Sequence, residues 1–382
     1  MTRIESVQAD CFLIPLPTAV SDSTHGTMAA FQLITVRVID SEGATGVGYT
    51  FTVGHGGTAV LALLRDDLAD WLVGQPADGI ADLWQQMWWR LHWVGRGGVA
   101  SFAMAAVDIA LWDLQARRAG RPLWQHLRET VEWLTGADSP PVVTPYAGGI
   151  DLEDPIELLL DRTRDRLGSG FRAIKMKVGR PQLAEDVERV TSMRELLGPD
   201  IPLMVDANMR WSVDEAITAA RALGGLDLVW LEEPTSPEDW DGHTRIAEEG
   251  GLPIAAGENL HSVAEFRELI TRGGVSYPEP DVATVGGITP WLEVAQLSAA
   301  HDLPITTHGV HDLHVHLLAA IDHASFLEVH GFGLERFIAN PLVISDGQAL
   351  VPDRPGHGVE LDWERLRKSE IQGSGRIHSH CR

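Results

Sequence analysis

The sequence LMVDAN (203–208) places Asp206 directly after a short apolar run, and the same design recurs in LVWLEEP (228–234) and PIAAGEN (253–259). The three carboxylates follow one another at intervals of 26 residues. That interval is the length of one strand, one helix and two loops. Apolar runs of this length, each followed by helix-compatible sequence, are typical of buried parallel strands. The sequence therefore predicts repeated strand and helix units with a carboxylate at each strand end.

The repeat extends on both sides of these three segments and carries a chemically active side chain each time. The full series is Lys175 with Lys177, Asp206, Glu232, Glu258, Asp281, His308 and Glu328, at successive steps of 31, 26, 26, 23, 27 and 20 residues. Counting VVTPYAGG (142–149) as the first strand gives eight units. In a barrel of eight units the C-terminal strand ends meet at one mouth. We therefore expect an α/β fold, a (β/α)8 (modified TIM) barrel, whose mouth holds all of these side chains.

The 382 residues are too many for a small single domain and suit a barrel with an accessory domain. Residues 1–130 are expected to form an α+β capping domain, because FQLITVRVID (31–40) and GATGVGYTFTV (43–53) favour a hairpin and later segments favour helices. We expect one helix over residues 100–119, ended by Gly120, and core packing for the tryptophan stripe Trp84 and Trp88. The barrel is assigned to residues 131–338, after a boundary marked by Pro140-Pro141. Residues 339–382 are expected to return to the capping domain and to end in a mobile polar tail.

The net charge of −24, from 54 acidic and 30 basic residues, argues against nucleic acid or an anionic membrane as a partner. An anionic substrate stays compatible with it, because a bound metal reverses the local field. Cys11 and Cys381 lie near opposite ends and suggest no disulfide framework. No apolar run of about 18 residues and no signal-peptide pattern are present. We expect a cytoplasmic enzyme with a small-molecule carboxylate as its substrate.

Three carboxylates on successive strand ends, Asp206, Glu232 and Glu258, would repel one another if they were buried alone. Hard oxygen ligands of this kind suit Mg²⁺. For any one of these acids, a solvated loop position or a helix N-cap is the simpler explanation, and it is the one preferred for Glu233. Three in register favour one magnesium ion per active site.

The remaining polar residues favour proton abstraction next to a carboxylate. Lys175 and Lys177 lie two residues apart on one strand, so they share a face and are expected to depress each other's pKa. Asp281 is expected to orient His308, which gives a second base on the opposite side of the mouth. Glu328 would donate a hydrogen bond to an enediolate if it were protonated.

The histidines of HGVHDLHVH (308–316) offer a competing interpretation as a zinc site. Only His308 holds the strand-end position. His311, His314 and His316 fall in the following loop and helix, where capping and packing roles are favoured over zinc binding. No nucleophile elbow, phosphate-binding loop or Cys-x-x-Cys pair competes.

These residues together resemble the enolase superfamily in its mandelate racemase subgroup. AAVDIALWDLQA (105–116) resembles the N-terminal signature of that family, and the lysine pair, the carboxylate series, the Asp and His pair and the final Glu resemble its barrel signature. The resemblance implies that Lys177 and His308 are the two bases, that Lys175 tunes Lys177 and binds the substrate carboxylate, and that Glu328 is the electrophilic partner. It also implies a substrate or metal contact for Asn208 and assembly as a homo-oligomer, such as an octamer.

Substrate choice in this family depends on loops over the barrel mouth, here expected at residues 21–28 and 49–57. These loops offer a set of polar side chains as substrate-binding candidates: Thr24, His25, Tyr49 and His55, beside Ser23. Such groups suit a polyhydroxylated acid. We expect dehydration of an acid sugar, an aldonate or aldarate, to a 2-keto-3-deoxy acid, with His308 as the acid for the leaving C3 hydroxyl. A racemase or epimerase, a cycloisomerase of a sugar-acid lactone or anhydro acid, and a non-catalytic barrel are the alternatives, and the complete set of ligands and bases disfavours the last.

Overall fold

The structure, a computed structural model, describes residues 2–134, 142–330, 333–369 and 371. The chain opens with an antiparallel sheet of β1 (Ile4–Asp22), β2 (Gly26–Asp40) and β3 (Thr45–Thr52), in that order. The pairing of β2 with β3 confirms the hairpin predicted over residues 31–40 and 43–53. Asp40 fixes the turn between them, because its Oδ1 accepts hydrogen bonds from the backbone amides of Glu42 and Ala44.

Helices cover one face of this sheet: α1 (Gly57–Leu63), α3 (Ile80–Leu91) and α4 (Val99–Ala119). The π-helix η1 (Leu64–Ala69) and the short helix α2 (Asp70–Leu72) connect α1 to α3. α4 ends at Gly120, which has a φ of +64°, as predicted. A Cβ atom at Gly48 would lie 2.1 Å from the backbone oxygen of Ala106, so glycine allows α4 to pack directly on β3. α4 is long and apolar enough to cross a membrane by length and composition, but 78% of that window is buried, as in a core helix.

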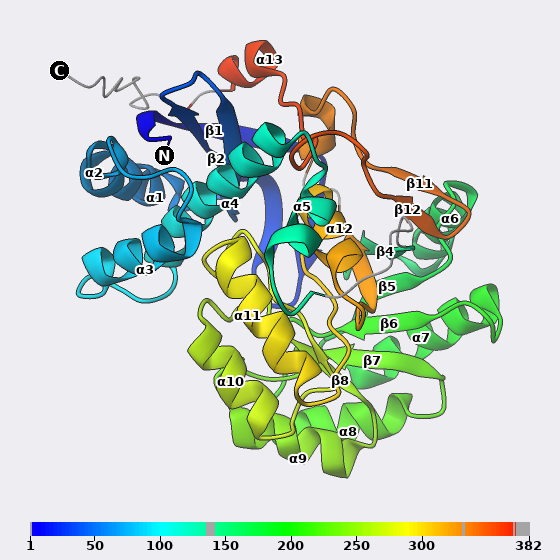
Figure 1. Ribbon diagram of the computed structural model, residues 1–382. Coiled ribbons are helices and arrows are strands. Elements are labelled where there is room, and N and C mark those ends of the chain that lie inside the picture. Colours follow the sequence, from blue (N-terminus) through cyan, green and yellow to red (C-terminus); the bar gives the residue numbers. More distant parts are fainter. Residues whose placement is uncertain (1, 135–141, 331–332, 370, 372–382) are drawn as a thin grey trace.

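Parallel strands form the wall of the barrel in the order β10-β4-β5-β6-β7-β8-β9. Their bounds are β4 (Thr144–Ile150), β5 (Ile174–Lys177), β6 (Leu203–Asp206), β7 (Leu228–Glu232), β8 (Ile254–Ala256), β9 (Tyr277–Pro278) and β10 (Phe326–Val329). Helices follow the strands and surround them in Figure 1: α6 (Ile156–Gly168), α7 (Leu183–Leu197), α8 (Val213–Leu223), α9 (Trp240–Gly250), α10 (Val263–Thr271), α11 (Ile288–Ala299) and α12 (His311–Ala320). Helices on the outside and side chains inside bury both faces of these strands, which explains their continuous apolar runs.

Residues 303–307 occupy the seventh barrel position, but they make too few backbone hydrogen bonds to form a regular strand. The backbone amide of Thr306 donates to the oxygen of Pro278 at 3.0 Å, on the β9 side. On the β10 side, the amide of Ser325 donates to the oxygen of Ile305 at 2.8 Å, next to a parallel bridge between Ile305 and Ala324. This segment therefore closes the ring, and the predicted (β/α)8 barrel with an N-terminal capping domain is confirmed.

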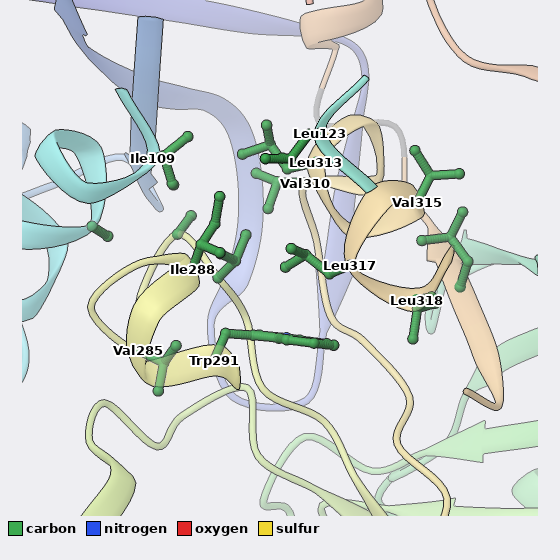
Figure 2. Packing of buried hydrophobic residues seen from close by; sticks show 14 of the residues in the cluster. Ile109, Leu123, Val285, Ile288, Trp291, Val310, Leu313, Val315, Leu317 and Leu318 are labelled. Carbon is green, nitrogen blue, oxygen red and sulfur yellow. The ribbon is translucent and has the colours of Figure 1, made fainter. Parts of the chain in front are cut away.

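A large buried core joins the capping domain to the barrel. Figure 2 shows Ile109 of α4, Leu123 of α5 (Leu123–Thr130), Ile288 and Trp291 of α11, and Leu313 and Leu317 of α12 pointing toward one another. Trp84 and Trp88 pack on a second core inside the capping domain, which agrees with their predicted packing role. The two domains therefore hold a fixed relation at the barrel mouth.

The C-terminal segment runs from the barrel back to the capping domain and contains η2 (Leu334–Phe337), β11 (Val343–Ser345), β12 (Gln348–Leu350) and α13 (Trp363–Arg367). His357 connects three parts of the molecule. Its Nε2 donates to the oxygen of Val47 in β3 at 2.7 Å, and its own carbonyl accepts from Nε2 of His316 in α12 at 3.0 Å. The predicted boundary at Pro140-Pro141 and the polar tail from residue 373 lie outside the described residues.

Candidate active site

The barrel brings the three predicted metal ligands together. One carboxylate oxygen from each of Asp206, Glu232 and Glu258 lies within 4.8 Å of the others. Asp206 ends β6 and Glu232 ends β7, and both are fully buried, while Glu258 follows β8 and is slightly exposed. Three converging carboxylates fit a divalent cation that prefers hard oxygen ligands. The donor set therefore fits Mg²⁺.

Both lysines of β5 face these carboxylates. Nζ of Lys175 lies 2.5 Å from Oε1 of Glu232 and 2.8 Å from Oε1 of Glu328, and Nζ of Lys177 lies 2.5 Å from Oδ2 of Asp206. Burial lowers the pKa of each lysine, but the carboxylates outweigh burial and raise the pKa of both above the usual value. Lys175 does lower the pKa of Lys177, as the sequence suggested, but the surrounding carboxylates outweigh that effect, so the expected net depression is not found.

Asp281 and His308 form the predicted pair at adjacent barrel positions. Nδ1 of His308 lies 3.0 Å from Oδ2 of Asp281, and Oδ1 of the same carboxylate accepts from the amide of Ala283 at 2.8 Å. On the other side of the ring, Nε2 of His308 lies 3.3 Å from Oε2 of Glu258. Burial lowers the pKa of His308, but Glu258 and Asp281 raise it to about 10. The imidazole is thus oriented by one carboxylate and directed toward the metal ligands.

Glu328 does not match the protonated donor expected from the sequence. One of its oxygens pairs with Lys175 and the other accepts from the backbone amide of Gly309 at 2.8 Å. Burial raises the pKa of Glu328, but Lys175 and His308 lower it well below the usual range. In this arrangement Glu328 is an ionised partner that positions Lys175.

A cavity of about 370 Å³ lies over these residues. Its floor contains Lys175, Lys177, Glu258, His308 and Glu328. Its walls include three of the predicted substrate-binding residues, Asn208, His25 and His55. Its upper part is largely apolar, with Val20, Met28, Phe31, Phe51, Val60, Val99 and Phe102. The lid is thus less polar than the sequence suggested.

Two of the predicted substrate-binding residues do not line this cavity. Tyr49 lies in β3 with a fully buried side chain, and its ring packs edge-on against His357 at 6.5 Å between centroids. Tyr49 is part of β3 and packs in the core, which the loop assignment overlooked, while Phe51 on the same strand face lines the cavity. Thr24 donates its hydroxyl hydrogen to the backbone oxygen of Asn208. It therefore joins the lid to the barrel.

The tip of the β1 and β2 hairpin forms the lid. In Figure 1 the long blue ribbons of these strands reach from the capping domain to the barrel. Ser21 donates from its backbone amide and its hydroxyl to the carboxylate of Asp151, at 2.6 and 2.7 Å. The hydroxyl of Ser23 donates to the backbone oxygen of Ala207 at 2.7 Å. These contacts hold the tip against the ends of β4 and β6.

Two buried glutamates near the site were not identified as functional candidates from the sequence. Glu233 is fully buried with a positive φ of 40°, and both of its oxygens accept from Nδ2 of Asn259 at 2.9 Å, so its expected role as a solvated loop residue or N-cap is wrong. Glu279 is buried two residues before Asp281. Burial raises the pKa of both glutamates well above the usual value. In PEPD (278–281), Glu279 lies two residues before Asp281, so both side chains point to the same side of an extended segment. This spacing could have identified Glu279 from the sequence.

The histidines after His308 are used in the scaffold. Nε2 of His314 accepts from the amide of Val282 at 2.9 Å, while His316 contacts His357 as described above. Within the described part of the chain, the only group of three or more candidate ligands is the carboxylate triad. The zinc alternative therefore has no support from the geometry.

Comparison with known proteins shows matches along most of the chain. A family profile described as "Mandelate racemase / muconate lactonizing enzyme, N-terminal domain" matches residues 8–127, and one described as "Enolase C-terminal domain-like" matches residues 159–365. The 3,6-anhydro-alpha-L-galactonate cycloisomerase of Streptomyces coelicolor is 54% identical over 96% of this chain and 99% of that protein. The L-talarate/galactarate dehydratase of Salmonella typhimurium is 35% identical over 97% of this chain and 92% of that protein.

Solved structures agree with these matches. A racemase from Streptomyces coelicolor A3(2) with bound magnesium superimposes with a TM-score of 0.92 at 52% identity, covering 96% of this chain and 100% of that one. L-Talarate dehydratase from Polaromonas sp. JS666, complexed with Mg and L-glucarate, superimposes with a TM-score of 0.92 at 34% identity, with full coverage of both chains. Both structures contain magnesium.

Proposed function

The chain belongs to the mandelate racemase and muconate lactonizing enzyme family of the enolase superfamily, and from that premise we propose that it catalyses a β-elimination on a sugar acid. A base at the cavity floor removes the proton at C2, next to the carboxylate, and the oxygen at C3 leaves. The product is an enol that becomes a 2-keto-3-deoxy acid.

The residues of the floor supply the first half of this reaction. Lys177 on β5 and His308 at the seventh barrel position come from different sides of the site, so each is assigned as the base for one face of C2. Carboxylates of the metal site raise the pKa of both groups, and a cation bound there would offset that charge and lower both pKa values. Lys175, held by Glu328, is placed to bind the substrate carboxylate. Mg²⁺ bound by Asp206, Glu232 and Glu258 would stabilise the negative charge that develops on that carboxylate.

The charge distribution of the cavity favours a monoacid substrate, and this observation carries the proposal. Both lysines that line the cavity lie at the floor, and no arginine is found among its described lining residues. The lid end instead presents Asp22, Asp151 and apolar side chains. A second carboxylate at that end would meet two acids and no lysine or arginine, because the His25 imidazole there is already paired with Asp22. Its burial would cost several kcal/mol. An aldarate therefore fits poorly, and a sugar acid with a neutral distal end fits well.

A 3,6-anhydro sugar acid suits this cavity. Its conversion combines two reactions considered from the sequence, dehydration and cycloisomerisation. Its C3 oxygen is part of a ring ether that also joins C6. When the C2 proton is removed and the C3–O bond breaks, the oxygen stays attached to C6 and takes up a proton, so no water is lost. The overall change is an isomerisation with the bond changes of a dehydration. The apolar upper wall favours such a compact ring over an open polyol chain.

The test is a substrate panel with magnesium: a 3,6-anhydrogalactonate, open-chain aldonates and galactarate, assayed for 2-keto acids with semicarbazide. We expect kcat/KM for the anhydro monoacid to exceed that for galactarate by about 100-fold or more. A preference for the diacid would refute the monoacid assignment.

Dehydration of an open-chain aldonate is the second candidate, since it uses the same two bond cleavages at C2 and C3. Proton NMR in ²H₂O separates these reactions from racemisation. Exchange at C2 with no 2-keto product from any acid would favour the racemase.

Two finer expectations belong to the same proposal: a cytoplasmic location and a homo-oligomeric assembly. Cys11 is buried and free, which suits a reducing compartment.

Trp93 and Val94, between α3 and α4, are 89% and 72% exposed and support burial of this region in an assembly. Light scattering coupled to size exclusion gives the oligomeric state directly.

A further inference from the structure

A second Asp and His pair lies in the lid, opposite the pair at the floor. Oδ1 of Asp22 accepts hydrogen bonds from the backbone amides of Thr24 at 2.8 Å and His25 at 2.6 Å. Its Oδ2 lies 2.9 Å from Nδ1 of His25. One carboxylate therefore shapes the turn and fixes the imidazole within it. With Nδ1 occupied, the hydrogen that His25 can offer to a ligand is on Nε2.

The lid contacts hold this pair over the cavity. Ser21 is bonded to Asp151, and Ser23 to the oxygen of Ala207, on either side of the pair. His25 lines the same cavity as Lys177 and Asn208, and its side chain is 34% exposed while that of Asp22 is 4% exposed. The imidazole is thus fixed at the rim of the cavity, and its carboxylate partner is almost buried.

His25 differs from two other histidines that line the cavity, His261 and His330. Burial lowers the pKa of His261, and it lowers the pKa of His330 to about 3, so both are neutral. The hydrogen bond to Asp22 raises the pKa of His25. A protonated imidazole at the lid can donate a proton to a substrate oxygen at that end of the cavity.

We infer that His25, oriented by Asp22, is the acid that protonates the oxygen leaving C3; this inference rests on the proposed function. A floor base takes the C2 proton, and the electrons of the C2–H bond form the C2–C3 double bond. The C3–O bond breaks, and its electron pair goes to the oxygen, which takes the Nε2 proton of His25. The enol then loses its hydroxyl proton and gains one at C3, while water returns a proton to His25.

This assignment replaces His308 as the leaving-group acid expected from the sequence. The substrate carboxylate is bound at the floor, so C2 lies near Lys177 and His308, and the substituents beyond C2 extend toward the lid. An acid on the lid works with either floor base, and therefore serves either configuration at C2.

The first experiment compares His25→Asn and Asp22→Asn with the magnesium-loaded wild type on the panel acid that wild type converts best. We expect His25→Asn to lower 2-keto acid formation by about 10²- to 10⁴-fold while exchange of the C2 proton in ²H₂O continues. Asp22→Asn keeps an oxygen to accept the turn amides and loses the carboxylate, so a smaller loss of about 10-fold is expected. His301→Asn, on an exposed histidine after α11, is the matched control and should leave both rates unchanged.

The second experiment uses a 3-deoxy-3-fluoro sugar acid as the probe. Fluoride is a weak base and leaves without full protonation, so His25→Asn should release fluoride within about 3-fold of wild type. Equal losses of exchange, fluoride release and turnover would show a structural or binding role and overturn the inference, as would unchanged turnover. If wild type itself exchanges C2 but converts no acid and releases no fluoride, the proposed function fails, which is a separate outcome.

Discussion

At the scale of single residues, the floor of the cavity places lysine ammonium groups against buried carboxylates, so that their charges offset one another. Lys175 and Lys177 contact Glu232, Glu328 and Asp206 at 2.5 to 2.8 Å. Burial raises the pKa of Glu232 to about 8, even beside Lys175. A divalent cation at the three carboxylates adds the positive charge that such a cluster needs.

Replacing one carboxylate therefore weakens the metal site. We expect Glu258→Gln to reduce Mg²⁺ affinity by at least about 10-fold, measured by calorimetric titration of the metal-free protein. Glu238→Gln is the matched control, because Glu238 is an exposed glutamate that is not part of the triad and should leave the affinity unchanged. Equal Mg²⁺ binding by Glu258→Gln and wild type would contradict the assignment.

Asp281 positions His308 and makes a second, separable contact. Asp281→Asn keeps an oxygen for the amide of Ala283 but loses the carboxylate that faces Nδ1 of His308. We expect kcat to fall by about 100-fold or more on substrates that need the histidine base, with KM changing by less than about 3-fold. Steady-state kinetics on both C2 epimers checks this. A loss that appears only in KM would place Asp281 in binding.

At the scale of elements, the hairpin of β1 and β2 acts as a lid because a few side chains join its tip to the barrel. Ser23 is suited to test this, since its hydroxyl bonds the oxygen of Ala207 and the side chain does not line the cavity. We expect Ser23→Ala to raise KM several-fold and to speed proteolysis within residues 20–28, because the lost hydrogen bond contributes about 1 kcal/mol. kcat and the midpoint of thermal unfolding should stay near wild type.

Ser41→Ala is a suitable control, because it removes a hydroxyl from the turn between β2 and β3, at the other end of the sheet. Unchanged proteolysis and KM in Ser23→Ala would show that this contact does not hold the lid.

At the scale of the whole molecule, His316 helps to join the barrel to the C-terminal segment through His357. Burial, together with the charges of His357 and Arg354, lowers the pKa of His316 to about 3. In the unfolded chain the pKa is about 6.5. The folded state therefore loses stability as pH falls from about 6.5 toward 3, because only the unfolded chain takes up the proton.

We expect His316→Gln, which keeps a hydrogen-bond donor, to flatten the fall in the free energy of unfolding below pH 6.5 by up to about 1.4 kcal/mol per pH unit. Denaturant unfolding at pH 7.5, 6 and 5 measures this slope. His301→Gln, at an exposed histidine, is the control. An unchanged slope in His316→Gln would mean that other groups determine the acid sensitivity.

The sequence alone determined the barrel and the floor of its cavity. In a parallel barrel the side chains at the C-terminal strand ends all lie at one mouth. The regular spacing of polar residues after apolar runs was therefore enough to predict that four of them share a site: Asp206, Glu232, Glu258 and His308. The hairpin of the capping domain and the end of α4 at Gly120 followed from local turn and capping preferences.

Only the tertiary structure decided the charge states and the lid. The spacing of Lys175 and Lys177 suggested that each would lower the pKa of the other, but acids from distant strands outweigh this effect and raise both pKa values. Tyr49 lies in β3 and His25 in the turn between β1 and β2 of the same domain, yet one is buried in the core and the other faces the cavity. Periodicity fixes which strand end a residue occupies; distances between segments far apart in the sequence fix what that residue can do there.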